Sequence, residues 1–585
     1  MEEAKRKRYD RQLRIWGEHG CVRGTRPPAF LEPTMSLFSR EIADFGVPNL
    51  DDDPRHLVTD ARDLPSLLAR ARRQARLEEC KVCLLNCGPT GTETIKNLVL
   101  GGIASFTLVD DAIVEARDLG NNFFVHASDL GQSKAKAVAA HLNELNTSVA
   151  GSFVDERPED LVASNPDFFA DFTVVVATQM PRASLVALDA ACRERGVILV
   201  ALHAHGLSGI VRLSLAEHTV VEAKPEETDF DLRVAAPWPE LDAWAHAFDL
   251  DALDDVAHKH VPHVVILLRA LRSWRAAHGG RVPENAAEQR EFKAFVTSGG
   301  RRSDEDNFRE AAAAARHAWK PPGAVPAAVR DVLADSALET LAAPETFDFW
   351  FLVAGLAGFL AEGGGAMPLE GSLPDMTSTT ESYVALQKLY QAKASADADA
   401  VAAHVRAALR AAGRPESSIS LADVRHFCKH AAHIRVVRWL TLAEEDAWGG
   451  GCGAELARNL ASEDTRACAT LYVLHRAADV FRERYGRFPG TPLDDPSTDL
   501  AEDVAKLKDV AAGVLAEVGV PGSVGELDDL VVEHVRCGGG EVHAVASVVG
   551  GIGSQEVIKL VTRQFTPCAK TLVYDAAKAV TASIM

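Results

Sequence analysis

The sequence predicts an α/β protein in which one mainly parallel sheet, covered by helices on both faces, is interrupted by a large helical insertion. Strand-like apolar runs alternate with helical segments between residues 81 and 216. Residues 217–525 have helical periodicity and are rich in Ala, Leu, Arg and Glu, and residues 526–585 return to the first pattern. Alternating strands and helices are typical of βαβ units with parallel strands. We therefore expect the first and last segments to form one domain.

The composition is that of a globular protein with an acidic surface. The 585 residues carry 62 Lys and Arg against 83 Asp and Glu, a net charge of −21, and 47% are hydrophobic. This charge argues against a nucleic-acid partner, which requires clustered basic side chains. We find no run of 18 or more apolar residues and no signal peptide, and so expect no membrane span. Ten irregularly spaced cysteines indicate reduced thiols in the cytoplasm or nucleus.

Two short features have both a structural and a functional interpretation. Cys80 and Cys83 form the one C-x-x-C pair. No second pair follows at zinc-ribbon spacing, so we interpret both as buried strand residues and expect no metal site. The basic run Lys5–Arg8 is either a nuclear address or, as we favour, a solvated helix start.

In the first part of the chain, the sequence predicts an insertion followed by alternating strands and helices. Residues 21–71, rich in Arg, Pro and Asp, form an atypical insertion that is loop-like over about 22–62. A helix start is predicted near residue 90. Predicted strands cover 81–87, 104–111, 151–156, 171–179, 197–206 and 209–215, and predicted helices cover 131–146 and 183–196.

The remaining elements complete the predicted domain organisation. Within the insertion, helices are predicted over 263–277, 307–318, 348–361, 380–392, 398–412, 467–484 and 500–518. Near the end we predict a strand over 528–536, a pair of helices over 541–563 and a strand over 571–576. The predicted domains are residues 1–216, 217–525 and 526–585, of which the first and last belong together.

A glycine-containing turn joins the first strand to a helix, which is the layout that binds dinucleotides. A phosphate cradle needs small residues whose N–H groups point at the anion. Here Asn86 puts a side chain where the tight turn favours glycine, and Pro89 removes an N–H donor. We therefore favour a Rossmann-type turn without a ligand over a nucleotide site. Thr90 and Glu93 predict a capping box at the helix start.

Several longer motifs resemble those of ubiquitin-type activating enzymes and their bacterial adenylating relatives. YDRQLRIWG is similar to the N-terminal signature of that family, and GSLPDM, RYGRFPG and GGIGSQEVIKLVTRQF extend the match. Together they most resemble the regulatory subunits of neddylation activating enzymes, over nearly the whole chain except 21–71. The resemblance implies a Rossmann-like, adenylation-type (ThiF/MoeB-like) domain interrupted by a half-domain of the catalytic-cysteine region.

Departures from the active members of that family concern the charged groups. Active members have a G-x-G-G-x-G loop, whose first glycine is Asn86 here. They hold the triphosphate with the arginine of an R-Q-F motif, where this chain has Asn121 and Asn122. They place an acidic residue for magnesium where this chain has Gln179 and Met180. Neutral amides and a thioether replace neither the arginine nor the metal ligand.

A few nucleotide-contacting positions keep the family's residues. Gly88 and Gly91 are retained in the loop, and Asp110 and Lys134 stand at the positions for ribose and phosphate contact. The resemblance therefore implies a relic site. We expect this chain to bind no cofactor or metal there and to perform no adenylation alone, with ATP and magnesium on a catalytic partner.

The thioester step is missing in a similar way. Active members place their nucleophilic cysteine before a threonine, and none of the ten cysteines here precedes one. We predict that Cys428, Cys452 and Cys468 pack in the helical region rather than react. The chain ends soon after Tyr574, so we expect the ubiquitin-like domain that recruits the conjugating enzyme to belong to the partner.

One positive role follows from the resemblance. Arg11 matches the arginine that this family supplies in trans to the partner's ATP site, and the alternative is an interface salt bridge. The pseudo-adenylation domain is expected to bury a large apolar surface against its homologue. Phe123 and Phe124, on a predicted strand, and the helix around 554–558 are candidates for the core or that interface. Trp238 is expected in the core, and the alternative is a contact at the rim of the groove.

The predicted function is that of a regulatory subunit of a heterodimer. With its catalytic partner it would adenylate and thioesterify the neddylation modifier for transfer to a conjugating enzyme and cullins. One alternative is the corresponding subunit for the SUMO-type modifier. Another is a nucleotide-cofactor oxidoreductase using His203 or His205, which the broken loop disfavours. We expect the protein in the cytoplasm, with the nucleus as an alternative. Residues 21–71 are either a lineage-specific loop or a wrongly retained coding segment.

Overall fold

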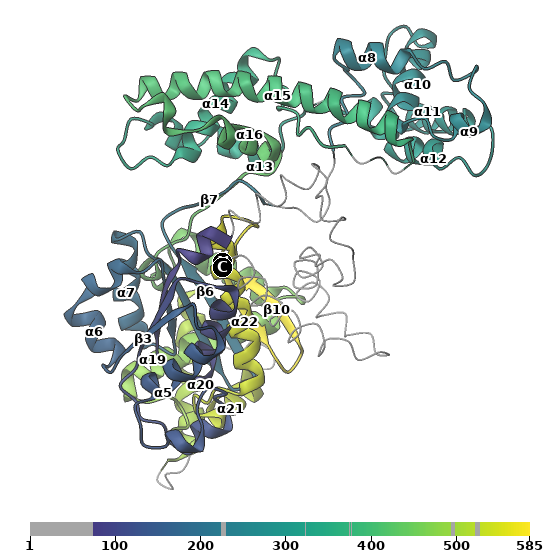
Figure 1. The fold of residues 1–585 in the computed structure, drawn as a ribbon. Coiled ribbons are helices and arrows are strands. Elements are labelled where there is room, and N and C mark those ends of the chain that lie inside the picture. Colours follow the sequence, from purple (N-terminus) through teal and green to yellow (C-terminus); the bar gives the residue numbers. More distant parts are fainter. Residues whose placement is uncertain are drawn as a thin grey trace. The chain divides into compact units, whose positions relative to one another are not determined.

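The computed structural model describes residues 74–223, 230–321, 323–373, 375, 377–492, 498–520 and 527–585. These residues form two compact units (Figure 1). Unit 1 combines the described residues before Thr219 with Val437–Thr562 and Pro567–Met585, and unit 2 consists of Thr219–Val436 and Arg563–Thr566. Segments far apart in the sequence therefore share unit 1.

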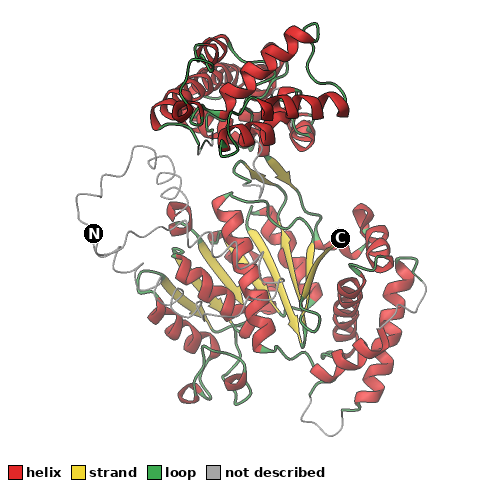
Figure 2. Cartoon of the chain, turned by 90° about the vertical axis from the view of Figure 1, so that its right-hand side faces the viewer, coloured by secondary structure: helices red, strands yellow, loops and turns green. Residues whose placement is uncertain are grey.

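An eight-stranded mixed sheet forms the centre of unit 1, in the order β10-β9-β6-β5-β4-β1-β2-β3. The five strands from β5 to β3 pair in parallel, whereas β6, β9 and β10 pair antiparallel with their neighbours. Helices cover both faces (Figure 2). The strands are β1 Lys81–Leu85, β2 Ser105–Val109, β3 Ala150–Val154, β4 Val174–Thr178, β5 Ile198–His205, β6 Ser208–Ser214, β9 Thr571–Asp575 and β10 Val580–Ile584. The predicted α/β fold is confirmed.

The central strands are apolar on both faces because helices cover both. All five residues of β4 are buried. In β1, Val82 and Leu84 pack in one core with helices α4 (Pro89–Gly101) and α22 (His543–Thr562). Cys83 and Leu85 pack in a second core with helices α6 (Pro158–Ser164) and α7 (Arg182–Glu194). This two-sided burial explains the continuous apolar runs that predict a parallel sheet.

The helices of unit 1 come from both ends of the described chain. Those from the first part are α4 Pro89–Gly101, α5 Lys134–Leu145, α6 Pro158–Ser164 and α7 Arg182–Glu194. Those from the last part are α17 Leu442–Asp446, α18 Cys452–Ala461, α19 Arg466–Tyr485, α20 Leu500–Glu517, α21 Leu527–Cys537 and α22 His543–Thr562.

Helix α22 lies against α4 with very little space between the two backbones. A Cβ atom at Gly550 of α22 would stand 3.0 Å from the carbonyl oxygen of Thr90 and 3.0 Å from the backbone nitrogen of Thr94. Only glycine permits so close an approach without displacing one helix. At the next residue, Gly551, a Cβ atom would meet nothing within 4 Å.

Two predictions for the last part of the chain are wrong. The run 528–536, predicted as a strand, lies within helix α21. Its buried residues Leu527, Val531, His534 and Val535 recur at helical spacing, and the Val-rich composition hides this stripe. The predicted pair of helices over 541–563 is one helix, α22, because its glycines serve the contact with α4 and do not break it.

Among the described residues, one helix is long and apolar enough to cross a membrane by length and composition. This helix is α22, with a mean hydropathy of 1.3. Half of it is buried inside unit 1, where it packs against α4, β5 and β6. Packing in the core is sufficient to account for its composition.

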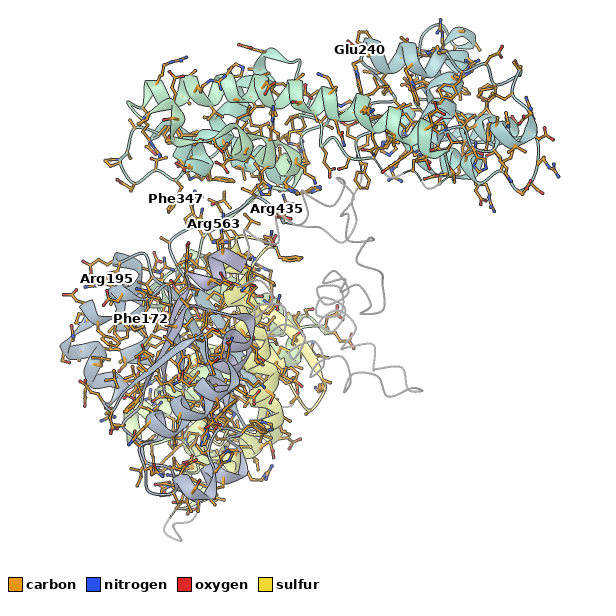
Figure 3. All side chains as sticks on the ribbon, viewed as in Figure 1. Phe172, Arg195, Glu240, Phe347, Arg435 and Arg563 are labelled. Carbon is orange, nitrogen blue, oxygen red and sulfur yellow. The ribbon has the colours of Figure 1, made fainter. Side chains whose placement is uncertain are left out.

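Unit 2 is mainly helical and has two hydrophobic cores. The first core involves α8, α10, α11 and α12, and the second involves α13, α14 and α16. Figure 3 shows the side chains that fill them, with Glu240 of α8 labelled. The helices are α8 Pro239–His246, α9 Asp255–His258, α10 His263–Ala277, α11 Ala286–Ser298, α12 Asp306–Ala313, α13 Ala327–Leu333, α14 Asp348–Glu362, α15 Thr380–Ala411 and α16 Leu421–His430.

Helix α15 joins the two cores of unit 2. Its first half contributes Leu386 and Tyr390 to one core, and its second half contributes Val401 and Leu409 to the other. The sequence predicts two helices here, 380–392 and 398–412, whereas the structure has one helix of 32 residues. The polar segment between them contains neither Gly nor Pro and is rich in alanine, so nothing ends the helix.

The structure divides the chain differently from the predicted return at residue 526. The chain re-enters unit 1 at Val437, next to the short strand β8 Arg435–Val437, which pairs with β7 His218–Val220. Helices α18–α21 belong to unit 1 because their apolar faces pack around the antiparallel edge of the sheet, and α17 belongs to it through Leu442, which packs in the core of α6 and α7. Val573 of β9 and Ile584 of β10 share one core with Leu474 and Phe481 of α19.

We predict opposite effects from alanine at two neighbouring positions of α22. Gly550→Ala forces α22 and α4 apart and is expected to lower the free energy of unfolding by about 1–3 kcal/mol. Gly551→Ala adds a methyl group in open space and is expected to raise it by up to about 1 kcal/mol, because alanine favours a helix. Chemical denaturation monitored by circular dichroism measures both. Equal effects would contradict the close helix contact.

Candidate functional site

The turn after β1 keeps the shape of a phosphate loop. Asn86 has a positive φ of 68°, and Gly88 is the N-cap of α4, with Pro89 in the first turn. The predicted capping box of Thr90 and Glu93 is wrong. Thr90 lies inside the helix, and no side chain caps its start, because proline at the first position already begins the helix. The N–H groups at this end therefore remain available to an anion.

An internal carboxylate occupies the position next to these N–H groups. Glu541, which precedes α22, accepts a hydrogen bond from the backbone N–H of Thr90 at 3.0 Å. A Cβ atom at Gly88 would collide with Oε1 of Glu541. The glycine at this position therefore leaves room for the chain's own acid. Sequence analysis missed Glu541, which lies about 450 residues further along the chain.

The Glu541 carboxylate is held at an energetic cost. Burial raises its pKa above the usual range, although hydrogen bonds from Thr90 and the charge of Lys134 act in the opposite direction. The Lys134 ammonium forms an ion pair with Asp118 at 3.0 Å. The retained lysine therefore already has a carboxylate partner within the chain.

Asp110, the expected ribose contact, is also engaged by the backbone. Its two carboxylate oxygens accept hydrogen bonds from the N–H groups of Cys87 at 2.7 Å and Ala112 at 2.8 Å. The side chain is buried, and this burial raises its pKa. Asp110 consequently fixes the glycine turn against the end of β2.

The two asparagines at the R-Q-F positions tie the same turn together. Asn121 donates from its amide to the carbonyl of Glu541 at 2.9 Å. Asn122 donates to the carbonyl of Cys87 at 2.9 Å and accepts from the N–H of Phe124 at 3.0 Å. The neutral amides of Asn121 and Asn122 thus stabilise the turn at the positions where active relatives are expected to have a cationic side chain.

The residues at the magnesium positions are likewise used inside the fold. The side-chain amide of Gln179 donates to the carbonyl of Ala204 and accepts from its N–H. Met180 is buried, and Asn86 donates to the carbonyl of Thr178 at 2.7 Å. None of these groups offers the free carboxylate oxygen that magnesium favours.

The structure therefore brings the retained residues together but assigns most of their polar atoms to internal partners. Gly88 and Lys134 lie near Glu541, and Asp110 holds the same turn through the N–H of Cys87. Gly91 fits because a Cβ atom there would stand 2.8 Å from the carbonyl oxygen of Asn86. Arg11 and the insertion 21–71 lie outside the described residues.

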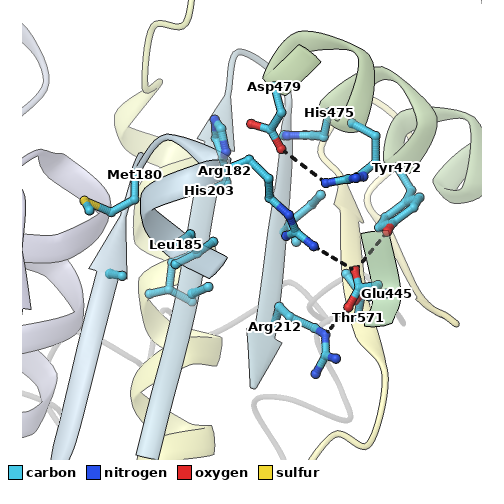
Figure 4. Close-up of a pocket in the computed structure, with 15 residues that line it drawn as sticks. Met180, Arg182, Leu185, His203, Arg212, Glu445, Tyr472, His475, Asp479 and Thr571 are labelled. Carbon is cyan, nitrogen blue, oxygen red and sulfur yellow. Dashed lines mark hydrogen bonds and ion pairs between the residues drawn. The ribbon is translucent and has the colours of Figure 1, made fainter. Parts of the chain in front are cut away.

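A second polar feature of unit 1 is a cavity of about 50 Å³ lined mainly from β5, β6, α7 and α19. Figure 4 shows arginines around Glu445. Glu445 accepts from Arg212 at 2.7 Å and from the hydroxyl of Tyr472 at 2.9 Å. Burial opposes its charge, yet the arginines lower its pKa. Arg182 pairs with Asp446 at 2.6 Å. These ion pairs tie α7 and α17 to the sheet, which supports a structural role.

His203 and His205 belong to a cluster of buried rings beside this cavity. Burial lowers the pKa of His203 to about 4 and that of His205 to about 3, so both are neutral at physiological pH. His205 stacks on His534 with ring centroids 3.5 Å apart and donates to its backbone carbonyl. Their packing agrees with the structural interpretation.

The candidates for the core and the dimer interface separate in the structure. Phe123 and Phe124 lie in a turn rather than on a strand, because Asn122 fixes the backbone there. Phe124 is buried, whereas the Phe123 side chain is 67% exposed. In α22, Ser554 and Val557 are buried in the core. Phe123 thus remains as an apolar group on the surface.

The other predicted packing residues are indeed internal. Trp238 packs against the first core of unit 2, with its ring 5.0 Å from that of Tyr390. Cys428 and Cys468 are buried, and burial raises their thiol pKa values to about 12 and about 11. Cys452 is buried as well, with a raised pKa. Neutral, buried thiols are poor nucleophiles.

Comparison with known proteins gives one family over most of the chain. The model of the ThiF family matches residues 61–583. An Arabidopsis thaliana protein named NEDD8-activating enzyme E1 regulatory subunit AXL is 41% identical, covering 98% of both chains. The regulatory subunit AXR1 of the same plant is 45% identical over 86% of this chain and 92% of its own. The Xenopus laevis NEDD8-activating enzyme E1 regulatory subunit is 34% identical over 98% and 97%.

We predict that Glu541→Gln stabilises the protein in a pH-dependent way. Because the pKa of Glu541 is raised in the folded chain, the wild type loses stability as pH rises through the interval between the unfolded and folded pKa values. The variant should therefore have the higher Tm at neutral pH, and the difference should shrink as pH falls towards about 4.5.

Glu444→Gln is the matched control for this measurement. Hydrogen bonds from the backbone and hydroxyl of Thr441 lower the pKa of Glu444, so its carboxylate contributes stability above its unfolded pKa. Glu444→Gln should lower the Tm at neutral pH, the opposite sign. A lower Tm at neutral pH for both variants would contradict the inference that the ionised Glu541 carboxylate at the start of α4 destabilises the folded protein.

Proposed function

The chain belongs to the ThiF family and, within it, to the NEDD8-activating enzyme E1 regulatory subunits, and from this premise we propose that it is the non-catalytic half of a heterodimeric activating enzyme. With a catalytic subunit it adenylates and thioesterifies the neddylation modifier, which then passes to a conjugating enzyme and cullins. Nothing in the comparisons favours the SUMO-type alternative.

The occupied phosphate loop supports the non-catalytic role more than any other observation. The α4 N-terminus is the position at which this fold would place phosphate, and Glu541 presents a negative charge to it. A triphosphate approaching the same N–H groups would meet that carboxylate at close range. Displacing it would also break the hydrogen bond that the carboxylate accepts from the N–H of Thr90. ATP and magnesium are therefore assigned to the partner.

Surface features of unit 1 support an interaction with a second protein. Phe123 is exposed next to a turn that hydrogen bonds hold in place. An exposed aromatic residue on a fixed backbone is a good anchor for a protein interface. The acidic net charge of −21 favours a protein partner over nucleic acid. The partner proposed is the catalytic subunit, with a homologous adenylation-type domain.

Arg11 is proposed as the residue that acts on the partner's site. A guanidinium stays charged at every physiological pH and forms two parallel hydrogen bonds with phosphate. Placed across the interface, it would neutralise charge that develops while the carboxylate of the modifier attacks ATP. The Arg11 proposal rests on the motif in the sequence.

The first experiment tests Arg11 in the complex. ATP–pyrophosphate exchange is followed with the modifier, the catalytic subunit and either wild type or Arg11→Ala, with Arg6→Ala as the control. We expect Arg11→Ala to lower the exchange rate by about 10²–10³, because one transition-state contact is lost. Size-exclusion chromatography checks that the heterodimer persists. An unchanged rate would leave Arg11 as a structural residue, and activity of the chain alone would overturn the non-catalytic role.

The second experiment tests the relic site. Lys134 would be essential to a working adenylation site, but here its ammonium pairs with Asp118. We expect Lys134→Ala to leave the exchange rate of the heterodimer within about twofold, because the reaction is proposed to take place in the partner's site and not beside Lys134. Intact dimer with a large loss of exchange would mean that this chain's own site takes part in the reaction.

A further inference from the structure

Three side chains of unit 2 converge from separate segments. His263 is the first residue of α10, Glu310 lies on α12, and Asp375 lies in the connection between α14 and α15. The Nδ1 atom of His263 stands 3.7 Å from Oε1 of Glu310 and 3.7 Å from Oδ2 of Asp375. All three atoms lie within 4.8 Å of one another.

Two of these atoms are buried and have no hydrogen-bond partner. They are Nδ1 of His263 and Oδ2 of Asp375. The side chains are 4% and 0% exposed. A separation of 3.7 Å is too long for a hydrogen bond between them. A buried polar atom without a partner typically costs about 1–3 kcal/mol of folding free energy. Two such atoms that face each other therefore indicate a bound ligand that both of them contact.

The second oxygen of each carboxylate fixes its orientation. Oδ1 of Asp375 accepts from the N–H groups of Thr377 and Ser378, each at 3.0 Å. Oε2 of Glu310 accepts from the Thr377 hydroxyl at 3.2 Å. The remaining oxygens are thereby turned towards His263. Such supporting hydrogen bonds are typical of carboxylates that bind metal ions.

The distances match donors that share one ion. Two ligands at about 2.0–2.2 Å from a zinc ion, separated by a roughly tetrahedral angle, stand about 3.3–3.7 Å apart. An ion of charge +2 would also balance the two carboxylates. In the part of the chain that the structure describes, Asp375 forms no ion pair with Lys or Arg, and its only basic neighbour there is His263.

We propose that His263, Glu310 and Asp375 bind a divalent transition-metal ion of the zinc class. One imidazole nitrogen and two carboxylate oxygens are a ligand set that zinc accepts, with water in the fourth position. Calcium and magnesium favour larger sets of oxygen ligands and are less suited to this site. The ion holds the start of α10, helix α12 and the 375 connection together.

The proposal departs from our expectation of no metal site, which rested on ligand spacing in the sequence. The three ligands share no short motif, because they come from segments that only the fold brings together. His258, the last residue of α9, differs from His263 in already having a hydrogen-bond partner. Its Nδ1 is 2.8 Å from Oε1 of Glu305, and this pair is already a closed hydrogen bond.

The test uses the full-length protein, stripped of metal with a chelator and desalted. Zinc chloride is titrated against a competing chelating dye, elemental analysis gives the stoichiometry, and thermal unfolding is recorded with and without zinc. We expect one tightly bound zinc per chain, a higher Tm with zinc and no such shift with magnesium. Stabilisation follows because the ion binds the folded chain preferentially.

Variants separate this site from adventitious binding by the other histidines. Asp375→Asn and Glu310→Gln should each weaken zinc binding at least about tenfold and remove the zinc-dependent Tm shift. Glu310 is one-third exposed, so its variant tests the site even if Asp375→Asn fails to fold. His258→Gln should keep the binding and the shift. Equal zinc binding by wild type and Glu310→Gln, or no zinc-dependent shift in wild type, overturns the proposal.

Discussion

Helix α22 lies against α4 at a point where the α4 backbone leaves room for no side chain larger than that of Gly550. The contact joins the described segment before Thr219 to the last part of the chain, and unit 1 depends on both. It also positions the residues just before α22. Glu541 reaches the start of α4 because α22 is fixed alongside it. One helix contact therefore completes the hydrophobic core and decides what occupies the phosphate loop.

A helix N-terminus with free N–H groups attracts negative charge, and a protein has two ways to provide it. A nucleotide enzyme leaves the position open for phosphate, which arrives and leaves. This chain places Glu541 there, at the cost of a raised pKa. Hydrogen bonds within the chain then hold the turn, and they involve the side chains of Asn121, Asn122 and Asp110. The loop keeps its shape because the shape is part of the fold, while its ligand-binding groups are satisfied from within.

Local patterns predict the elements whose side chains pack in a regular way. The apolar run of β4 and the helix α10, predicted over 263–277, follow directly from periodicity. Prediction fails where one local signal conflicts with packing. The valines of α21 favour a strand, but their spacing buries one helical face. The polar middle of α15 suggests a break, yet the helix continues because two cores hold its two ends.

The site shows the same limit more sharply. The departures from the family's motifs lie in the first part of the chain, whereas Glu541, which contacts the phosphate loop, lies about 450 residues further along. Substitutions at Asn121 and Gln179 are visible in the sequence, since each stands where a charged group is expected within a motif. Nothing near the loop indicates Glu541, which follows a glycine run far along the chain. The same holds for His263 and Asp375, whose unpartnered atoms meet only after folding. A sequence motif shows that a charged residue is replaced by a neutral one. The residue that takes the vacated place is determined by tertiary packing, so only the structure identifies it.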